Sequence, residues 1–589
     1  PLLDMSAGDE AAAVSDVEGA DEEERVSDEA AESASPSAIG SAGSKSGARR
    51  RRRSGGRGPA CRGLRVNTVA CTGKSAKDLF AVTAEQLGWR EVDVEARPSA
   101  GSPRPSALKT IYCVMQTSDM VERLPLRASS WATRYAAMPE LCDKGNLARM
   151  IASFQDLVGE GTFAFSPRTW VLPEQLEELK AVVGKSSKTF IVKPEDGSQG
   201  DGIFLVQGVR DLDIKLSCKA NKSGVAQRYL DKPLLHRGFK FDFRVYVAFI
   251  GGSESAPPFV YLCREGLARF CTELYEEPSQ KNMHKCMGHL TNYSLNKRSE
   301  QFEHSGETVD AVFSKSTQSS KRPLTVALQQ IAEERPDFRP EEFYGKVTDC
   351  VRSTAALMAP VLQAAGRELH TGGELRSCQV LGFDVMLDHR GEPYLLEVNN
   401  SPSLCIDEAL PLDEAELAEA AAKKGPRAKT AAGDAVCRCM DMQQPHRHRT
   451  SLVDLVVKRT VMAGLFRMLE GLGEEPDVAP SDEDYIEVDL RGDEVFELLA
   501  SVEKLFRRAG GAKAFTSAGL RRVLGPLCCK GALEKHDLDA MALRLRASRF
   551  QGDQAMRLFD YVQVLREVSA KAFPGMPPGE AIRKALEAT

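Results

Sequence analysis

The pattern of apolar and polar positions predicts strands and helices in irregular order from about Leu64 onward. Short runs rich in β-branched and aromatic residues, with Gly and Pro between them, are typical of strands. Such runs occupy residues 66–71, 110–116, 189–192, 202–206, 225–230, 241–249, 259–263, 380–387 and 393–398. Helical spacing of apolar residues marks 173–183, 343–362 and 451–469. Because strands and helices do not alternate regularly, we expect an α+β fold.

Changes in composition divide the chain into units. Residues 1–60 are acidic, then rich in Ser, Gly and Ala, and contain the run Arg49–Arg53; they bury too little apolar surface to fold, so we expect a disordered tail. The other expected units are an N-terminal α/β subdomain (61–187), a core of two subdomains (188–406), an inserted loop (407–449), a helix completing the core (450–470), an acidic linker (471–494) and a helical C-terminal module (495–589). The first residue is Pro1 rather than Met, which suggests a fragment of a longer chain.

Cysteine usage and hydropathy narrow the class of protein. The 15 cysteines are an odd number without CxxC pairs, which indicates reduced thiols in an intracellular protein rather than a disulfide framework. No apolar run approaches the roughly 20 residues that a membrane span needs. We therefore expect a cytosolic protein that does not bind membranes.

The clearest chemical signal is a pair of strands that carry acidic residues. If a two-residue turn at Arg390-Gly391 joins them, Asp384 and Glu397 become cross-strand neighbours, and Asn399 lies on the face of Glu397. Two carboxylates and an amide at one place predict a bound cation, and oxygen ligands suit Mg²⁺. The alternative is a hairpin whose acidic side chains face solvent.

A glycine-rich loop after Lys193 is the expected partner for phosphates. Lys193 ends a strand, and residues 195–202 contain three glycines whose backbone N–H groups can approach phosphate oxygens closely. The spacing fits neither the GxxxxGKS loop nor GxGxxG, so it indicates neither a P-loop nor a Rossmann protein. An ordinary hairpin loop is the alternative.

The segment 239–244 alternates between aromatic and charged residues. Lys240, Asp242 and Arg244 share one face of the expected strand, and three phenylalanines share the other. A solvated outer face is the usual reason for this pattern. Here the charges follow a loop and precede the apolar run 245–250, so they could instead line a cleft.

Six motifs occur in an order that resembles the tubulin tyrosine ligase-like family, in its polyglutamylase branch. They are Lys193-Pro, Gln227-Arg-Tyr-Leu, Phe239-Lys-Phe-Asp-Phe-Arg, Arg264-Glu-Gly, His289-Leu-Thr-Asn-Tyr-Ser-Leu-Asn-Lys and Leu396-Glu-Val-Asn. The resemblance covers about Leu64 to Leu469, and residues 495–589 are similar to the C-terminal region of type-11 polyglutamylases. It implies an ATP-grasp core, with ATP between two subdomains.

The resemblance also implies roles for individual residues. ATP would contact Lys193, Gln199, Gly200, Gln227, Arg228, Tyr229, Leu230, Lys240, Asp242, Thr291 and Asn292. Glutamate would contact Arg269, Tyr293, Ser294, Lys297 and Lys458, and Mg²⁺ would bind Asp384, Glu397 and Asn399. Arg244, Lys193 and Glu397 would act in catalysis, with Arg244 at the acyl-phosphate oxygens. The lysine equivalent to Lys458 normally lies soon after the Glu-x-Asn motif, so the insert would displace it here.

The implied function is ATP-dependent ligation of glutamate to glutamate side chains or chains on the acidic tails of tubulin, by a monomer that binds no nucleic acid. The implied location is the cytoplasm and cytoskeleton, including the cilium or basal body. Alternatives are a glycine ligase, a glutamylase of another acidic protein, and a catalytically dead scaffold that binds microtubules. The basic stretch Lys423–Arg459 and the run Arg49–Arg53 could dock acidic tails or serve only as solvated loops.

Overall fold

The structure is a computed structural model. It describes residues 65–71, 73–92, 110–114, 130–195, 200–217, 223–252, 256–369, 376–412, 415–416, 418, 446–472, 480–510, 517–546 and 554–589. The expected tail 1–60, Gln199 and most of the inserted loop lie outside the described residues, so the structure does not test the predictions made for them.

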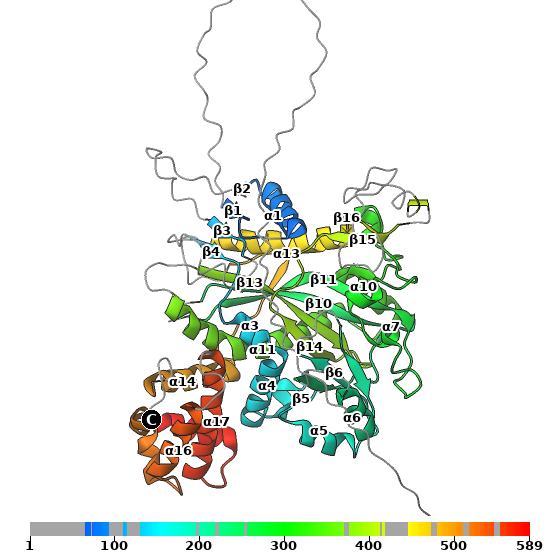
Figure 1. Ribbon diagram of the computed structural model, residues 1–589. Coiled ribbons are helices and arrows are strands. Elements are labelled where there is room, and N and C mark those ends of the chain that lie inside the picture. The colour runs from blue at the N-terminus through cyan, green and yellow to red at the C-terminus, as the bar shows by residue number, and fades with distance from the viewer. Residues whose placement is uncertain are drawn as a thin grey trace, which may run out of the picture. The chain divides into compact units, whose positions relative to one another are not determined.

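A mixed sheet of 11 strands lies at the centre of the described chain (Figure 1). The strand order is β12-β11-β10-β13-β4-β3-β1-β2, and β14, β17 and β9 pair with β13, β11 and β10. The strands are β1 (Arg65–Asn67), β2 (Arg90–Val92), β3 (Thr110–Tyr112), β4 (Trp131–Ala132), β9 (Leu235–His236), β10 (Phe239–Ile250), β11 (Phe259–Leu274), β12 (Lys321–Pro323), β13 (Arg376–Leu387), β14 (Pro393–Asn399) and β17 (Tyr485–Glu487). The sheet is antiparallel from β12 to β13 and parallel from β13 to β2. The predicted α+β class is confirmed.

Helices cover both faces of this sheet. Alternate residues of β10, such as Phe243 and Val247, pack with α11 on one face, while Tyr246 and Ala248 pack with α13 and α1 on the other. The helices that precede the C-terminal module and do not belong to the second sheet are α1 (Lys74–Gln86), α3 (Met138–Cys142), α4 (Lys144–Val158), η1 (Glu160–Phe163), α7 (Cys286–His289), α8 (Tyr293–Asn296), α9 (Val309–Val312), α10 (Leu324–Glu334), α11 (Pro340–Leu369) and α13 (Leu452–Gly471). None of the helices in the described ranges combines the length and the apolar character that crossing a bilayer requires.

A second sheet has four antiparallel strands in the order β5-β8-β6-β7, with two helices packed on it. Its elements are β5 (Thr169–Leu172), α5 (Leu176–Val183), β6 (Phe190–Pro194), β7 (Phe204–Val206), α6 (Val209–Ser217) and β8 (Gly224–Arg228). Strand β5 precedes residue 188 but pairs with β8, so the small sheet takes a strand from the stretch expected in the N-terminal subdomain.

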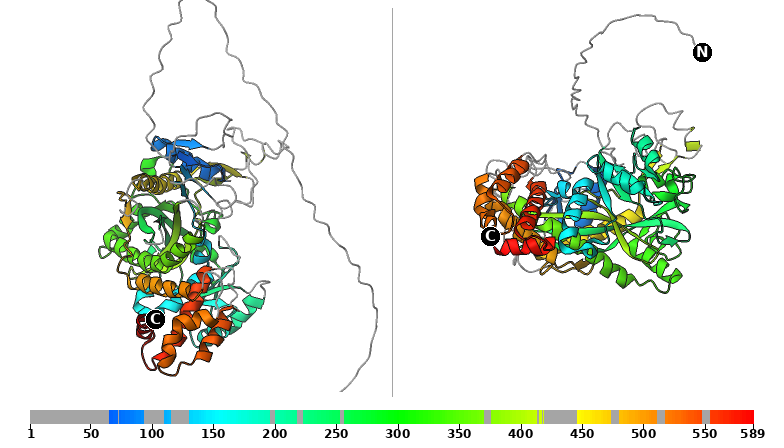
Figure 2. Two further views of the ribbon diagram at one scale, coloured as in Figure 1. Left: turned by 90° about the vertical axis from the view of Figure 1, so that its left-hand side faces the viewer. Right: turned by 90° about the horizontal axis from the view of Figure 1, so that it is seen from below.

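The C-terminal module is helical, and it packs beside α4 and α11 (Figures 1 and 2). Its elements are α14 (Glu494–Arg508), α15 (Ser517–Leu524), η2 (Gly525–Cys529), α16 (Lys535–Arg546), α17 (Gln554–Ala572) and α18 (Pro578–Glu587). The acidic segment 471–494, expected as a linker, contributes β17 to the central sheet. The inserted loop begins and ends in two paired strands, β15 (Asp407–Pro411) and β16 (His446–Thr450).

Candidate active site

The hairpin β13–β14 brings the two predicted carboxylates together. Asp384 and Glu397 are cross-strand partners, and Asn399 lies opposite Gly382 on the same strand pair. The Asn399 amide nitrogen donates to both carboxylates, at 3.4 Å to Asp384 and 3.3 Å to Glu397. The predicted pairing of Asp384 with Glu397 is confirmed.

The predicted two-residue turn is wrong, although the pairing that it led to is right. The loop has three residues, 389–391, because the Asp388 amide donates to the Glu392 carbonyl oxygen. Gly391 closes the loop at a φ of 84°, a conformation that glycine adopts without strain. Pairs next to the loop are one residue out of the predicted register, and an irregularity between Asp384 and Val385 restores it.

Charged side chains from five neighbouring strands form a row across the central sheet, which we call the charged row. Its members in strand order are Lys321 on β12, Arg269 on β11, Asp242 and Arg244 on β10, Asp384 on β13 and Glu397 on β14. Each member lies opposite the next across a strand pair, except that Asp242 and Arg244 are two residues apart on one strand. The row therefore follows from strand register and the two-residue period of a strand.

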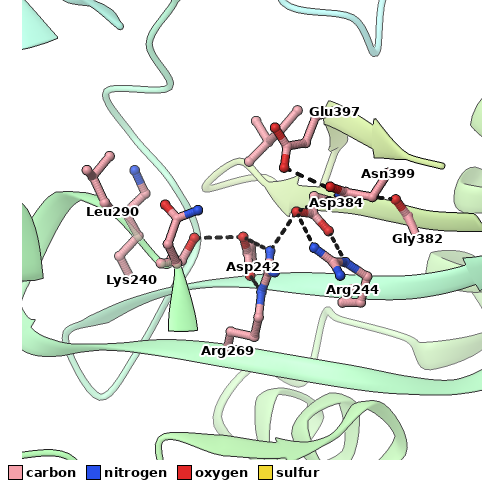
Figure 3. A network of polar contacts seen from close by, with 12 residues as sticks. Lys240, Asp242, Arg244, Arg269, Leu290, Gly382, Asp384, Glu397 and Asn399 are labelled. Atoms are coloured by element: carbon pink, nitrogen blue, oxygen red, sulfur yellow. Dashed lines mark hydrogen bonds and ion pairs between the residues drawn. The ribbon is translucent and has the colours of Figure 1, made fainter. Parts of the chain in front are cut away.

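Two arginines hold the buried carboxylates of the charged row (Figure 3). The Arg269 guanidinium donates to both carboxylate oxygens of Asp242, at 2.7 and 2.6 Å, and lies 2.9 Å from Asp384. Arg244 donates to both oxygens of Asp384, through Nη2 at 3.0 Å. Burial alone would raise the pKa of Asp384, but the two guanidinium groups lower it well below its usual range. Asp384 is therefore a carboxylate whenever the protein is folded near neutral pH.

A cleft opens above the charged row, with about 610 Å³ of empty space including its solvent-open mouth, and both sheets contribute to it. Residues predicted from the sequence that line it are Lys193, Gln227, Arg228, Tyr229, Leu230, Lys240, Asp242, Arg269, Thr291, Asn292, Asp384 and Glu397. Ile191, Ile203, His289, Leu290, Met386 and Leu396 complete the lining and were not singled out. The structure thus gathers motifs that are up to about 200 positions apart in the sequence around one cavity, as expected of a ligand site.

The alternation in residues 239–244 forms one wall of this cleft. Lys240 and Asp242 are 2% and 3% exposed, so the alternative of a solvated outer face is wrong. Phe241 and Phe243 pack in the core on the opposite face of β10. Charge is tolerated on the inner face because Asp242 accepts from Arg269 and from the Thr291 hydroxyl at 2.6 Å.

Two buried lysines give the cleft its positive charge. Lys193 donates to the oxygens of Gln227, at 3.0 Å, and Leu396, at 3.3 Å, which are both neutral acceptors. Lys240 donates to the Tyr229 hydroxyl and the His289 carbonyl oxygen. Burial lowers the pKa of Lys193, and it lowers the pKa of Lys240 to about 8. Ammonium groups held against neutral oxygens are suited to an anionic ligand, and a nucleotide with its phosphates is one.

The residues assigned to glutamate lie at the β12 end of the charged row. Lys458 and Lys321 both form ion pairs with the buried Asp454, at 2.9 Å from Lys458. The Tyr293 ring centroid is 3.9 Å from the Lys321 ammonium and 5.5 Å from that of Lys297. Ser294 is on the same short helix, α8. The insert therefore does not remove Lys458 from this cluster.

Sequence reasoning missed two lysines at this site. Lys321 pairs with Arg269 across β11 and β12, which are far apart in sequence and not joined by a hairpin. Lys144, at the start of α4, lines a second cavity together with Lys193 and Glu397. The two adjacent basic residues Lys321-Arg322 at the start of a strand were the signal that could have identified Lys321. The sequence around Lys144 does not distinguish it from other lysines at the start of a helix.

The oxygen-bearing trio fits Mg²⁺ in its donor chemistry. In the described part of the chain no cluster of three or more His, Cys, Asp or Glu side chains could hold a metal; the trio has two carboxylates and an amide instead. Mg²⁺ is commonly held by one or two carboxylates plus phosphate oxygens and waters. The Asn399 amide would have to turn so that its oxygen, rather than its nitrogen, faces the carboxylates. Gly200 borders the site beside Asn292 and Leu295. The roles of the site residues in binding ATP, glutamate and Mg²⁺ stay predictions.

Comparison with known proteins identifies the class. Residues 127–415 match the Tubulin-tyrosine ligase family, so the chain carries a domain of this family and the resemblance in its motifs is confirmed. The curated relatives include the tubulin polyglutamylase ttll-11 of Caenorhabditis elegans, 35% identical over 50% of this chain and 40% of the relative. Tubulin polyglutamylase TTLL11 of Homo sapiens is 34% identical over 47% of this chain and 38% of the relative. Tubulin polyglutamylase ttll6 of Danio rerio is 36% identical over 47% of this chain and 33% of the relative. The chain spans two fifths or less of each of these relatives.

Substitution of Gly382 tests whether the charged row depends on close packing. A Cβ at Gly382 would lie 2.7 Å from the Arg244 Cδ and 3.1 Å from the Pro402 Cβ. We expect Gly382→Ala to displace Arg244 from Asp384 and to lower stability by about 1–3 kcal/mol. Gly345→Ala is the control, because a Cβ there meets no atom within 4 Å. Equal thermal unfolding of the two variants, followed by circular dichroism, would contradict this picture.

If the cleft binds a nucleotide, the pH dependence of that binding tests the role of the positive charge of the cleft. The pKa of Lys240 is about 8, and the ammonium form favours an anionic ligand. Affinity for a fluorescent ATP analogue should be constant below pH 8 and fall above it, by up to about tenfold per pH unit. Lys240→Met should bind more weakly at pH 7 and lose the fall that begins near pH 8. An unchanged pH profile in this variant would rule out a role for the Lys240 charge.

Proposed function

We propose that the protein is an ATP-dependent ligase that joins glutamate to glutamate residues in the acidic tails of tubulin. The observation that supports it most is the charged row, where two arginines from neighbouring strands pair with buried carboxylates beside a cleft that both sheets line. The similarity to relatives named as tubulin polyglutamylases supports the substrate class. The cleft between two sheets is also the arrangement expected of an ATP-grasp core.

ATP would supply the phosphoryl group that turns an acceptor carboxylate into an acyl phosphate, with Mg²⁺ neutralising phosphate charge. The hinge Gln227–Leu230 would bind the base, and Lys240, Asp242, Thr291 and Asn292 would orient the sugar side. Lys193, which lines both cavities, and Lys144, which lines the second, would attract the phosphates. These residues position reactants rather than form bonds with them, as phosphoryl transfer requires.

Arg244 would stabilise the acyl-phosphate oxygens, since it lies between the metal trio and the loop at Pro402. The α-amine of free glutamate would then attack the acyl carbon, the phosphate would leave, and the amine would lose its proton. The product is an isopeptide branch, or a peptide bond when a chain grows. Arg269 would bind the α-carboxylate of the incoming glutamate and orient its amine, exchanging part of its pairing with Asp242 and Asp384.

The cluster at the β12 end favours glutamate over glycine. Lys321 and Lys458 share one carboxylate, Asp454, so these three groups together carry one net positive charge. Burial would raise the pKa of Asp454, but the two ammonium groups lower it well below the usual range. The side-chain carboxylate of glutamate would match the extra charge, whereas glycine has no group to do so.

Some of the arginines that could dock the acidic tails of tubulin already form ion pairs within the protein. In the expected docking stretch, Arg447 pairs with Glu416, and Arg449 pairs with Glu307 and Glu408. Docking through this stretch would require these pairs to exchange partners, so the cleft itself is the better candidate for the first contact. Microtubules of the cytoplasm, including those of cilia and basal bodies, would be the setting.

Loss of Glu397 tests the proposal directly. Glu397→Gln keeps the shape of the side chain but removes a charge expected to hold Mg²⁺, so ligation should fall roughly 10²–10³-fold. The assay is incubation with tubulin, MgATP and isotope-labelled glutamate or glycine, followed by mass spectrometry of the tails. Glu392→Gln is the matched control, because Glu392 is exposed in the same hairpin and pairs with Lys346 at the surface. Wild-type turnover by Glu397→Gln would refute the assignment of Glu397 as a metal ligand. Incorporation of glycine alone would refute the assignment of glutamate as the amino acid that is added.

A further inference from the structure

The C-terminal module packs on the second half of α4. Phe154 on α4 meets Phe559 on α17 edge to face, with ring centroids 6.2 Å apart, and both are buried. The Gln563 amide donates to the Ser153 hydroxyl at 2.7 Å. An aromatic contact and a hydrogen bond, at the adjacent residues Phe154 and Ser153, therefore join these two helices.

Helix α18 approaches the last turn of α4 even more closely. A Cβ at Gly579 would lie 1.9 Å from the carbonyl oxygen of Leu157, so no side chain fits between the two backbones. Ile582 and Ala585, which follow on α18, are fully buried. The closeness of this approach fixes the end of α4 against the module, because neither backbone can move toward the other.

The first half of α4 belongs to the candidate active site. The helix begins at Lys144, where the Asp143 side chain accepts from the Asn146 amide and caps it. Lys144, Leu147 and Ile151 line the second cavity together with Lys193 and Glu397. The Lys144 charge also lowers the pKa of Lys193, although burial is the larger cause.

Helix α4 connects these two regions as a rigid element. It has 15 residues, no internal proline and a length of about 22 Å. A hydrogen-bonded helix moves as a unit, so a shift at Leu157 is carried to Lys144. Figures 1 and 2 show α4 lying alongside the orange and red helices of the module.

We propose that the C-terminal module is a positioning element of the active site, which fixes α4 and thereby holds the Lys144 ammonium at the second cavity, which Lys193 and Glu397 also line. Gly579 and Phe559 are the positioning residues, since they set the distance between the module and α4. The proposal rests on the nucleotide site proposed above and adds to it a role for residues 494–589.

Nucleotide affinity, measured by titration with a fluorescent ATP analogue, tests this role. Gly579→Ala forces α18 and α4 apart, and we expect it to weaken binding about tenfold. Gly525→Ala is the matched control in the same module, because a Cβ there meets nothing within 4 Å, and it should bind as the wild type does. Phe559→Leu, which thins the contact with Phe154 without adding atoms, should weaken binding in the same direction if Gly579→Ala does not fold.

A double-mutant cycle with Lys144→Met separates positioning from general stability. If the module acts through Lys144, Gly579→Ala should add less than a twofold loss when Lys144 is already methionine. Independent losses that multiply, or wild-type affinity in both Gly579→Ala and Phe559→Leu, would overturn the proposal. A wild-type protein that bound no nucleotide would refute the nucleotide site and this proposal together, whereas nucleotide binding without modification of tubulin would refute only the acceptor.

Discussion

The ion pairs that Arg244 and Arg269 make with Asp384 hold the candidate active site together. All three side chains are largely removed from solvent, and their pairing offsets the cost of burying their charges. The pairs exist because strand register sets Arg244 opposite Asp384 and Asp242 opposite Arg269. A slip of β10 by one residue would place phenylalanines in the cleft and charges in the core, so packing on the aromatic face enforces the arrangement of charges.

Features encoded by neighbouring residues could be predicted from the sequence. The alternation in 239–244 identified the charged face of β10, and the short hairpin after Leu387 identified the pairing of Asp384 with Glu397. The turn was predicted with one residue too few, and an irregularity in the strands compensated for the error. The length of the loop and the position of the irregularity depend on contacts outside the hairpin, so the local sequence pattern does not predict them.

Features that join distant segments could not be predicted. Lys321 meets Arg269 only because β12 adds to the edge of β11, and Tyr485–Glu487 joins the same sheet from within an acidic stretch. Lys144 enters the site because α4 packs beside β8 and the module. The family resemblance supplied part of the information that local patterns do not contain. It pointed to Arg269 and Lys458 as site residues without using the pairing of the strands.

The position of α13 explains why Lys458 reaches the site in spite of the insert. Strands β15 and β16 pair along their length, and the Ser451 amide donates to the Ile406 carbonyl oxygen, so the chain returns to the place where the insert left it. Helix α13 starts there, with Asp454 in its first turn, where the helix dipole favours a carboxylate. Lys458 follows one turn later and meets Lys321 across Asp454. Beyond this point α13 covers the apolar part of the sheet, so one helix both closes the core and places a charge at the end of the charged row.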